Sequence, residues 1–278
     1  MKRIIEKQVE EYLADCEKRN LSPKTIINYR DEVARLLKDV EADCVQKVTN
    51  EMIEEHLKMH EWSPCYINHH IISLKTMFRW FDARGYKLKF KPELLQRTIE
   101  PEKKLLYFTK EQIDKVLDKC DTMDWIMIRL CFECGLRISE LDNLKPEDIE
   151  GNRIKFIGKG RKCREVYVSD DLRQAIEAWV AYHQGWDYLW MQEINGRRRL
   201  YTVNGLRKRM QKAFNRAGFN EFHPHALRHS FATQVVNNGA PLHIVRDMMG
   251  HTRVSTTMRY IHRLDGQLQK AFSDYGAY

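Results

Sequence analysis

One short stretch of this chain has a clear strand pattern. Almost all of the rest has the spacing and end signals of helices. Residues 153–157 (R-I-K-F-I) and 164–168 (R-E-V-Y-V) alternate apolar and polar side chains, and the segment between them contains the G-K-G turn of a hairpin. Elsewhere apolar residues recur at helical spacing between capping residues and glycines. The sequence therefore predicts a mainly α protein with one small β-hairpin sheet.

Helix starts are marked most clearly in the first hundred residues. Ser22 and Ser63 are each followed by proline, and a capping hydroxyl before a proline at the first helical position is the expected order at a helix N-terminus. After Ser63, apolar residues from Ile67 to Phe81 fall on one helix face. We expect a small helical domain here.

A change of composition separates this region from the rest of the chain. Residues 86–104 are charged, contain two prolines and show little periodicity, which is typical of a linker. We predict a helical N-terminal domain, a linker and a second, mostly helical domain, over residues 1–95, 96–104 and 105–278.

The charge distribution points to a polyanionic partner. The chain of 278 residues has a net charge of +8, and almost all of the excess lies after residue 100. The segment 197–216 contains eight basic residues and no acidic residue, so contact with phosphate explains it better than a solvated helix face does. The candidate DNA-binding residues are Arg207, Lys208, Arg209 and Lys212.

Targeting and cysteine patterns indicate a cytoplasmic protein, close to the nucleoid. The chain has no apolar run of about 18 residues and no secretory h-region, so we expect no membrane partner. Its seven cysteines are irregularly spaced. Cys131 and Cys134 form a C-x-x-C within an apolar, helix-like stretch, where buried reduced thiols are a better interpretation than a zinc or redox site.

Residues able to hold and break a phosphodiester are spread along the second half of the chain. They are Arg137, Lys159, His225, Arg228, His251 and Tyr260. His225 and Arg228 are three residues apart and would share a helix face, from which an arginine fork can bind two phosphate oxygens. A tyrosine hydroxyl among clustered cations and a histidine base could act as a nucleophile.

Each of these residues has an ordinary interpretation when it is taken alone. A tyrosine on a helix usually packs, and a hairpin lysine such as Lys159 is usually exposed; Lys155 and Lys162 could also take its place. Arg137 could form a structural ion pair with Glu140, one turn further on. The functional interpretation rests on their occurrence together and in order.

The segments that carry these residues resemble the tyrosine recombinases, the phage integrase family that includes the Xer and Cre proteins. The resemblance covers residues 135–141 (G-L-R-I-S-E-L), 157–166, 225–233 (H-A-L-R-H-S-F-A-T) and 249–260. The first domain, with L-S-P-K-T-I-I-N-Y, is similar to the helical, SAM-like core-binding domain of that family.

This resemblance implies a role for each residue. Arg137 and Arg228 would clamp the scissile phosphate, Lys159 would protonate the 5′-hydroxyl, and His251 would hydrogen-bond the phosphate. His225 would be the acid–base partner of Tyr260, which attacks to give a 3′-phosphotyrosyl intermediate, and Glu140 would support the site. No metal, cofactor or ATP is implied.

The implied partners are duplex DNA carrying a specific site and further copies of the chain, as a tetramer on two duplexes. Accessory DNA-bending or directionality proteins are possible partners as well. Leu264, Leu268 and Phe272 recur at helical spacing and could pack in their own domain or dock on a neighbouring subunit. Two alternatives stay open: a type IB topoisomerase-like enzyme that relaxes DNA, and a DNA-binding protein that is catalytically silent.

Overall fold

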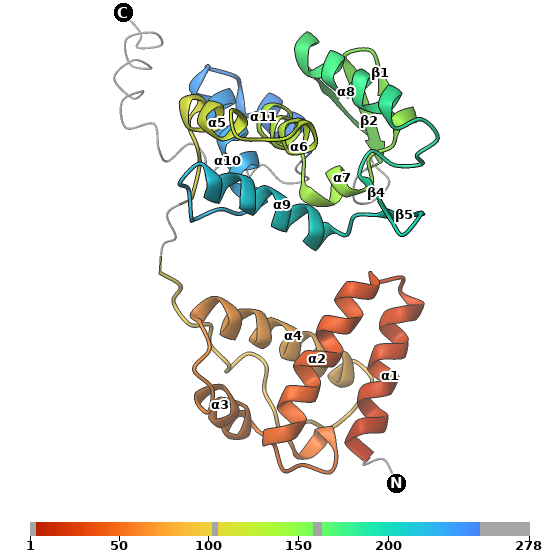
Figure 1. Cartoon of the computed structure of the whole chain (residues 1–278). Coiled ribbons are helices and arrows are strands. Elements are labelled where there is room, and N and C mark those ends of the chain that lie inside the picture. The colour runs from red at the N-terminus through yellow and green to blue at the C-terminus, as the bar shows by residue number, and fades with distance from the viewer. Residues whose placement is uncertain (1–3, 102–104, 158–162, 251–278) are drawn as a thin grey trace, which may run out of the picture. The chain divides into compact units, whose positions relative to one another are not determined.

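The computed structural model describes residues 4–101, 105–157 and 163–250, and the chain divides into two compact units between residues 103 and 104 (Figure 1). Each unit has its own hydrophobic core. Among the described helices, none has the length and apolar character needed to cross a bilayer.

The described part of the first unit is helical, as predicted. Its helices are α1 (Ile4–Lys18), α2 (Pro23–Asp39), a 3-10 helix (Val45–Lys47), α3 (Asn50–Lys58) and α4 (Pro64–Asp82). The Ser22 and Ser63 hydroxyls accept hydrogen bonds from the backbone N–H groups of Thr25 and Tyr66, at 3.1 and 3.3 Å. The predicted Ser-Pro helix starts are therefore confirmed.

The irregular stretch after α4 is only partly a linker. Phe90 and Leu95 are buried in the core of the first unit, and the ring centroids of Phe90 and Phe78 lie 4.6 Å apart. The charged residues around them stay exposed. The sequence from residue 86 therefore packs on the helices, although its composition resembles that of a linker.

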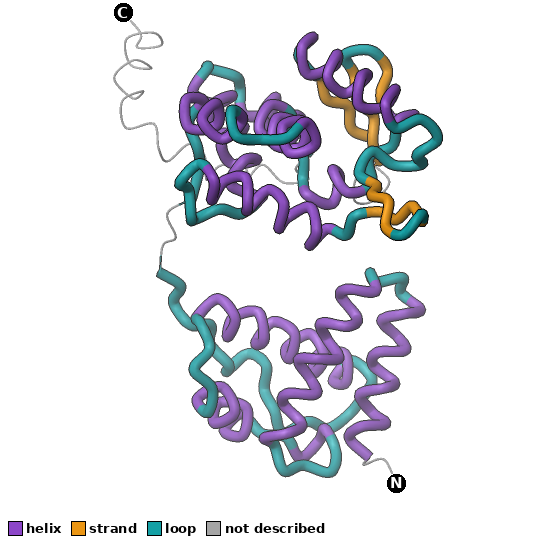
Figure 2. Tube along the Cα trace, viewed as in Figure 1, coloured by secondary structure: helices purple, strands orange, loops and turns teal. Residues whose placement is uncertain are grey.

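The second unit is mostly helical and carries its strands at one end. Its described elements are α5 (Lys110–Leu117), α6 (Thr122–Glu133), α7 (Ile138–Asp142), a 3-10 helix (Pro146–Asp148), β1 (Ile149–Glu150), β2 (Arg153–Ile157), β3 (Cys163–Tyr167), α8 (Asp170–Tyr182), β4 (Met191–Ile194), β5 (Arg197–Leu200), α9 (Val203–Arg216), α10 (Pro224–Asn237) and α11 (Leu242–Met249). Figure 2 shows the strands gathered at the end of the unit that also carries α8.

The predicted hairpin is present, and its strands pair in antiparallel register. Residues 153 to 157 of β2 pair with residues 167 to 163 of β3, and β1 extends the sheet on the other side of β2. The alternation seen in the sequence places Ile154 and Val166 in the core.

A second hairpin was not predicted. β4 and β5 pair antiparallel around Asn195 and Gly196, both of which have a positive φ, at 52° and 71°. Two central residues with positive φ form the turn type that matches strand twist, and Asn-Gly is its favoured sequence. This second hairpin adds to the predicted one, and the arginines at 197–199 lie on a strand.

The turn between α6 and α7 depends on a glycine. Gly135 has a φ of +60°, and a Cβ at this position would lie 2.5 Å from the Phe231 ring of α10. Only glycine combines this backbone conformation with such a close approach. The close approach of Phe231 places this turn against α10, which also packs against α6 and α11.

Candidate active site

Three arginines from three elements converge on one carboxylate. Arg137 precedes α7, Arg164 lies in β3 and Arg228 lies in α10. The Glu140 carboxylate of α7 is 2.6 Å from Arg137 Nη1, 3.3 Å from Arg164 Nη1 and 3.9 Å from Arg228 Nη1. The three arginines are far apart in the sequence, so only the fold of the second unit brings them to one carboxylate.

The carbonyl groups at the end of α11 hold the same arginines. The Met249 carbonyl accepts hydrogen bonds from Arg164 Nη1 at 3.0 Å, from Arg137 Nη2 at 3.5 Å and from Arg228 Nη2. The Gly250 carbonyl accepts from Arg137 Nη2 at 3.2 Å. A helix C-terminus carries partial negative charge, so it attracts these cations.

Arg228 is buried and fixed, while Arg137 is open to solvent. The Arg228 side chain is 5% exposed and also donates to the Gly135 carbonyl. The Arg137 side chain is 32% exposed. A buried arginine needs partners for its donors, and a partly exposed one can also reach a ligand.

Glu140 orients Arg137 through two contacts. Its carboxylate accepts from the Arg137 guanidinium and, at 2.8 Å, from the Arg137 backbone N–H, which closes a capping interaction at the start of α7. The contact expected between these two residues from their spacing is therefore present.

Arg164 was not predicted as part of the site. Its side chain is 7% exposed, and Nη2 donates to the Cys134 carbonyl at 3.0 Å. Burial lowers the pKa of its guanidinium, and the nearby Glu140 carboxylate opposes that shift. A Cβ on Gly250 would lie 3.0 Å from the Arg164 side chain, so this glycine makes room for the arginine.

His225 lies in the first turn of α10, on the face that also carries Arg228. Its side chain reaches the surface, but the surrounding protein shields it partly from water. This desolvation, followed by the positive charge of Arg228, lowers the pKa of His225. Smaller effects of the same sign come from His223, Arg137 and Arg207. The imidazole is thereby favoured in its neutral form.

The basic helix α9 presents two different faces. Arg207, Lys208 and Lys212 are exposed. The positive charge of Arg207 also lowers the pKa of both His223 and His225. Arg207 therefore lies close enough to His223 and His225 to disfavour their charged forms.

Arg209 takes a different place from the other three basic candidates. Its Nε lies 2.8 Å from Asp124 of α6, and its Nη2 lies 2.5 Å from Asp121. Arg216 lies 3.2 Å from the same Asp124. The segment 197–216 has no acidic residue of its own, but Asp121 and Asp124, at the start of α6, pair with Arg209. The lack of acidic residues in the segment is therefore no reason to expect Arg209 to contact phosphate.

The cysteine pair Cys131 and Cys134 is buried in the core, as expected. Burial raises the pKa of Cys134 to about 12 and that of Cys131 further. Both thiols are therefore protonated at neutral pH, which does not suit metal binding or redox exchange.

Three of the predicted site residues, Lys159, His251 and Tyr260, lie outside the described residues, as does the segment around Leu264, Leu268 and Phe272. The described chain reaches Gly250, one residue before His251, where the α11 carbonyls contact the arginines.

The chain is similar in sequence to proteins of a known family. Residues 107–267 match the model of the phage integrase family. Tyrosine recombinase XerC of Staphylococcus epidermidis is 30% identical over 277 residues, which cover 91% of this chain and 91% of the relative.

Solved structures share the fold. A XerH site-specific recombinase bound to its difH substrate has a TM-score of 0.69 and 23% identity, covering 94% of this chain and 83% of that one. A lambda integrase dimer bound to a COC′ core site has a TM-score of 0.75 and 14% identity, covering 92% and 94%. With the family match over more than half of its length, this chain belongs to the phage integrase family, the tyrosine site-specific recombinases.

Proposed function

We propose that this tyrosine recombinase cleaves and rejoins DNA at a specific site, with the arginine cluster as the holder of the scissile phosphate. The observation that carries the proposal is the convergence of Arg137, Arg164 and Arg228 on the single carboxylate of Glu140. Three guanidinium groups facing one carboxylate favour a bound anion. Arg137 is the member that reaches solvent, where a phosphate would arrive.

The proposed reaction exchanges one phosphate ester for another. The Tyr260 oxygen attacks the phosphorus while His225 accepts the phenol proton, and the bond to the 5′-oxygen breaks as Lys159 protonates that oxygen. The products are a 3′-phosphotyrosyl link and a free 5′-hydroxyl. Because one ester replaces another, a 5′-hydroxyl can reverse the step without ATP. The arginines and His251 would stabilise charge on the phosphorane oxygens.

The partners follow from the same proposal. They are duplex DNA carrying the target site and three further copies of the chain, with accessory DNA-bending or directionality proteins as additional partners. The cytoplasm, at the nucleoid, is the proposed location. Support comes from the bacterial source of the XerC relative and from the DNA-bound XerH and lambda integrase complexes.

A nicked suicide duplex tests the function. The target sequence placed in this duplex would be identified by crosslinking the protein to host DNA. We expect a covalent protein–DNA adduct and, with a second duplex, strand exchange. An adduct without exchange would favour topoisomerase-like relaxation. Tight binding to the recovered site without any adduct would favour a silent binding protein and contradict the proposal.

The charge state of His225 gives a pH prediction. Because desolvation and Arg228 lower its pKa, the neutral ring should persist as pH falls and become protonated only below the ordinary value of about 6.5. NMR titration of the free protein should therefore give a His225 midpoint below 6.5, with the His225→Gln variant used to assign the signal. A midpoint at or above 6.5 would contradict the described surroundings of this ring.

The two faces of α9 predict how DNA affinity depends on salt. In Lys212→Ala the loss of one phosphate contact should make the slope of log Kobs against log salt concentration less steep by about 0.9, measured on a generic duplex. Arg209→Gln is the matched control, since Arg209 pairs with Asp121 and Asp124. This control should keep the slope and lower the melting temperature. Equal slopes for Lys212→Ala and the unmodified protein would remove Lys212 from the interface.

A further inference from the structure

The first unit contains a hydrogen-bonded series of five titratable side chains that the proposed reaction does not use. His70 of α4 contacts Glu32 of α2 through Nδ1, and its Nε2 lies 2.9 Å from Nε2 of His56 in α3. His56 Nδ1 lies 2.6 Å from Asp39 Oδ2 at the end of α2, and His60 Nε2 lies 2.7 Å from the same oxygen.

The buried part of this series needs one proton more than two neutral imidazole rings carry. Three hydrogen bonds run from Glu32 through His70 and His56 to Asp39, and each needs one proton. Two neutral imidazoles supply only two protons. The third proton comes from an imidazolium ring or a protonated carboxyl, unless a metal ion takes its place between His56 and Asp39.

The two rings at the centre of the series are buried, because the side chains of His56 and His70 are both 0% exposed. A charge placed there is costly unless it is paired. A divalent metal in place of the third proton would leave both rings neutral, and neutral imidazole is the form that binds metals.

The ligand atoms are close enough for a metal site. One atom each from Asp39, His56 and His60 lie within 4.8 Å of one another. Zinc bonds of about 2.0–2.2 Å in a tetrahedron separate ligand atoms by about 3.3–3.6 Å. The two histidine nitrogens, at 2.6 and 2.7 Å from Asp39 Oδ2, would therefore move away from that oxygen by roughly 0.6–1.0 Å. Asp39 ends a helix and His60 lies in the loop after α3, and both can make that adjustment.

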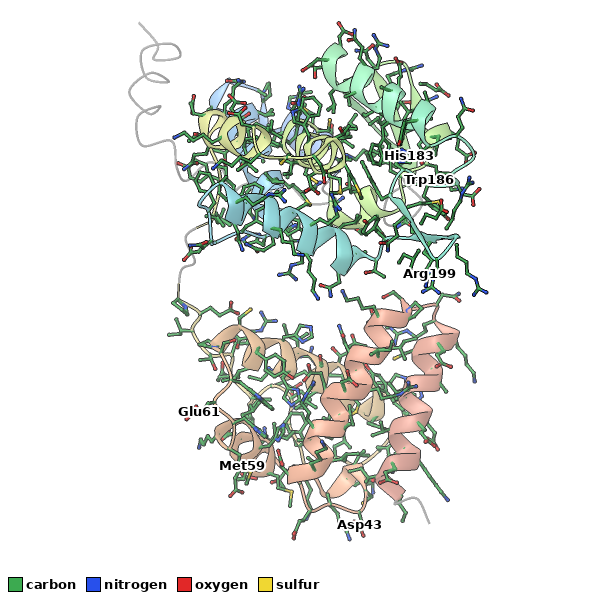
Figure 3. All side chains as sticks on the ribbon, in the orientation of Figure 1. Asp43, Met59, Glu61, His183, Trp186 and Arg199 are labelled. Atoms are coloured by element: carbon green, nitrogen blue, oxygen red, sulfur yellow. The ribbon has the colours of Figure 1, made fainter. Side chains whose placement is uncertain are left out.

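The surroundings resemble those of a metal ligand. A metal-bound histidine usually donates its other ring N–H towards a carboxylate, and here His56 would donate to His70, which donates to Glu32. The His60 ring stacks on Trp62 with centroids 4.2 Å apart, which fixes its orientation. The side chains of His60 and Asp39 are 36% and 21% exposed, so a metal can enter and retain water. Figure 3 labels Met59 and Glu61, which flank His60 in this loop.

We propose that Asp39, His56 and His60 bind Zn²⁺, with water completing the coordination, and that the metal ties the end of α2 to α3 and the loop after it. Two imidazoles and a carboxylate are a ligand set that suits zinc. Its three ligands lie in the first unit, whereas the arginine cluster lies in the second.

Calorimetric titration of the chelator-treated full chain with Zn²⁺, without DNA, tests this site. We expect one equivalent to bind and the melting temperature to rise with zinc, because a ligand of the folded state stabilises it. His60→Gln should weaken binding at least about 100-fold, since changes even outside the ligands cost about 10- to 100-fold. The partly exposed position of His60 in a loop makes this variant compatible with folding.

His69→Gln is the matched control. His69 is 56% exposed on the same helix as His70 and lies 3.7 Å from Glu32, away from the three ligands. It should bind zinc as the unmodified chain does. The proposal is overturned if the unmodified chain binds no equivalent of zinc, if His60→Gln binds equally well, or if only His69→Gln loses binding, which would indicate a surface ion. Nitrogen-15 NMR showing His56 still protonated at Nδ1 in excess zinc would also overturn it.

Discussion

Replacing Arg228 by alanine should slow cleavage of a nicked suicide duplex about 100- to 1000-fold, which is the usual cost of removing one preorganised donor from a charged transition state. The Arg228 guanidinium contacts the Gly135 and Met249 carbonyls and lies 3.9 Å from Glu140. It is therefore held in place before substrate arrives. Single-turnover formation of the covalent adduct, at saturating protein, measures the effect on the chemical step.

Arg228→Lys and Arg173→Ala serve as controls. The lysine keeps the charge but lacks the planar fork, so its rate should remain well below that of the unmodified protein. Arg173 pairs with Glu177 on the exposed face of α8, and its loss should leave the rate unchanged. An Arg228→Ala protein that is folded, binds DNA and cleaves at the unmodified rate would remove Arg228 from the phosphate site.

Replacing Tyr260 by phenylalanine should abolish the covalent adduct while leaving DNA affinity unchanged. The substitution removes one oxygen, the atom that would attack phosphorus, and keeps the ring. Gel analysis after denaturation measures the adduct, and an electrophoretic mobility shift measures binding.

Tyr182→Phe is the matched control for this variant. Tyr182 is 85% exposed on α8, and its hydroxyl has no part in the proposed reaction. It should form adduct at the unmodified rate. If Tyr260→Phe still forms the adduct, another residue is the nucleophile.

Local signals in the sequence predicted most of the helical fold, because they act over a few residues. The Ser22 and Ser63 caps occur as predicted. The second hairpin escaped prediction although Asn195-Gly196 is a strong turn signal, since the arginines at 197–199 were attributed to a basic segment rather than to a strand.

The site was predicted in part, because its assembly is not local. The Arg137–Glu140 contact follows from spacing along one short helix. One signal could have identified Arg164. It lies on the same face of its strand as Val166, which faces the core, so an apolar residue would be expected at position 164. Its partners on α7 and α11 are distant in the sequence, however, and no local pattern places them.

The partners of Arg209 and the histidine chain of the first unit show the same limit. Asp121 and Asp124 lie more than eighty residues before Arg209, so the absence of acidic neighbours in its own segment was not informative. His56 and His60 are four residues apart in the sequence, but Asp39 and His70 reach them only through helix packing.

Proteolysis and mass spectrometry of the adduct trapped on a suicide duplex would identify the residue that attacks the DNA. We expect one modified peptide, which contains Tyr260 joined to a 3′-phosphate of the cleaved strand. An adduct joined to any other residue, or strand exchange without a covalent intermediate, would contradict this expectation.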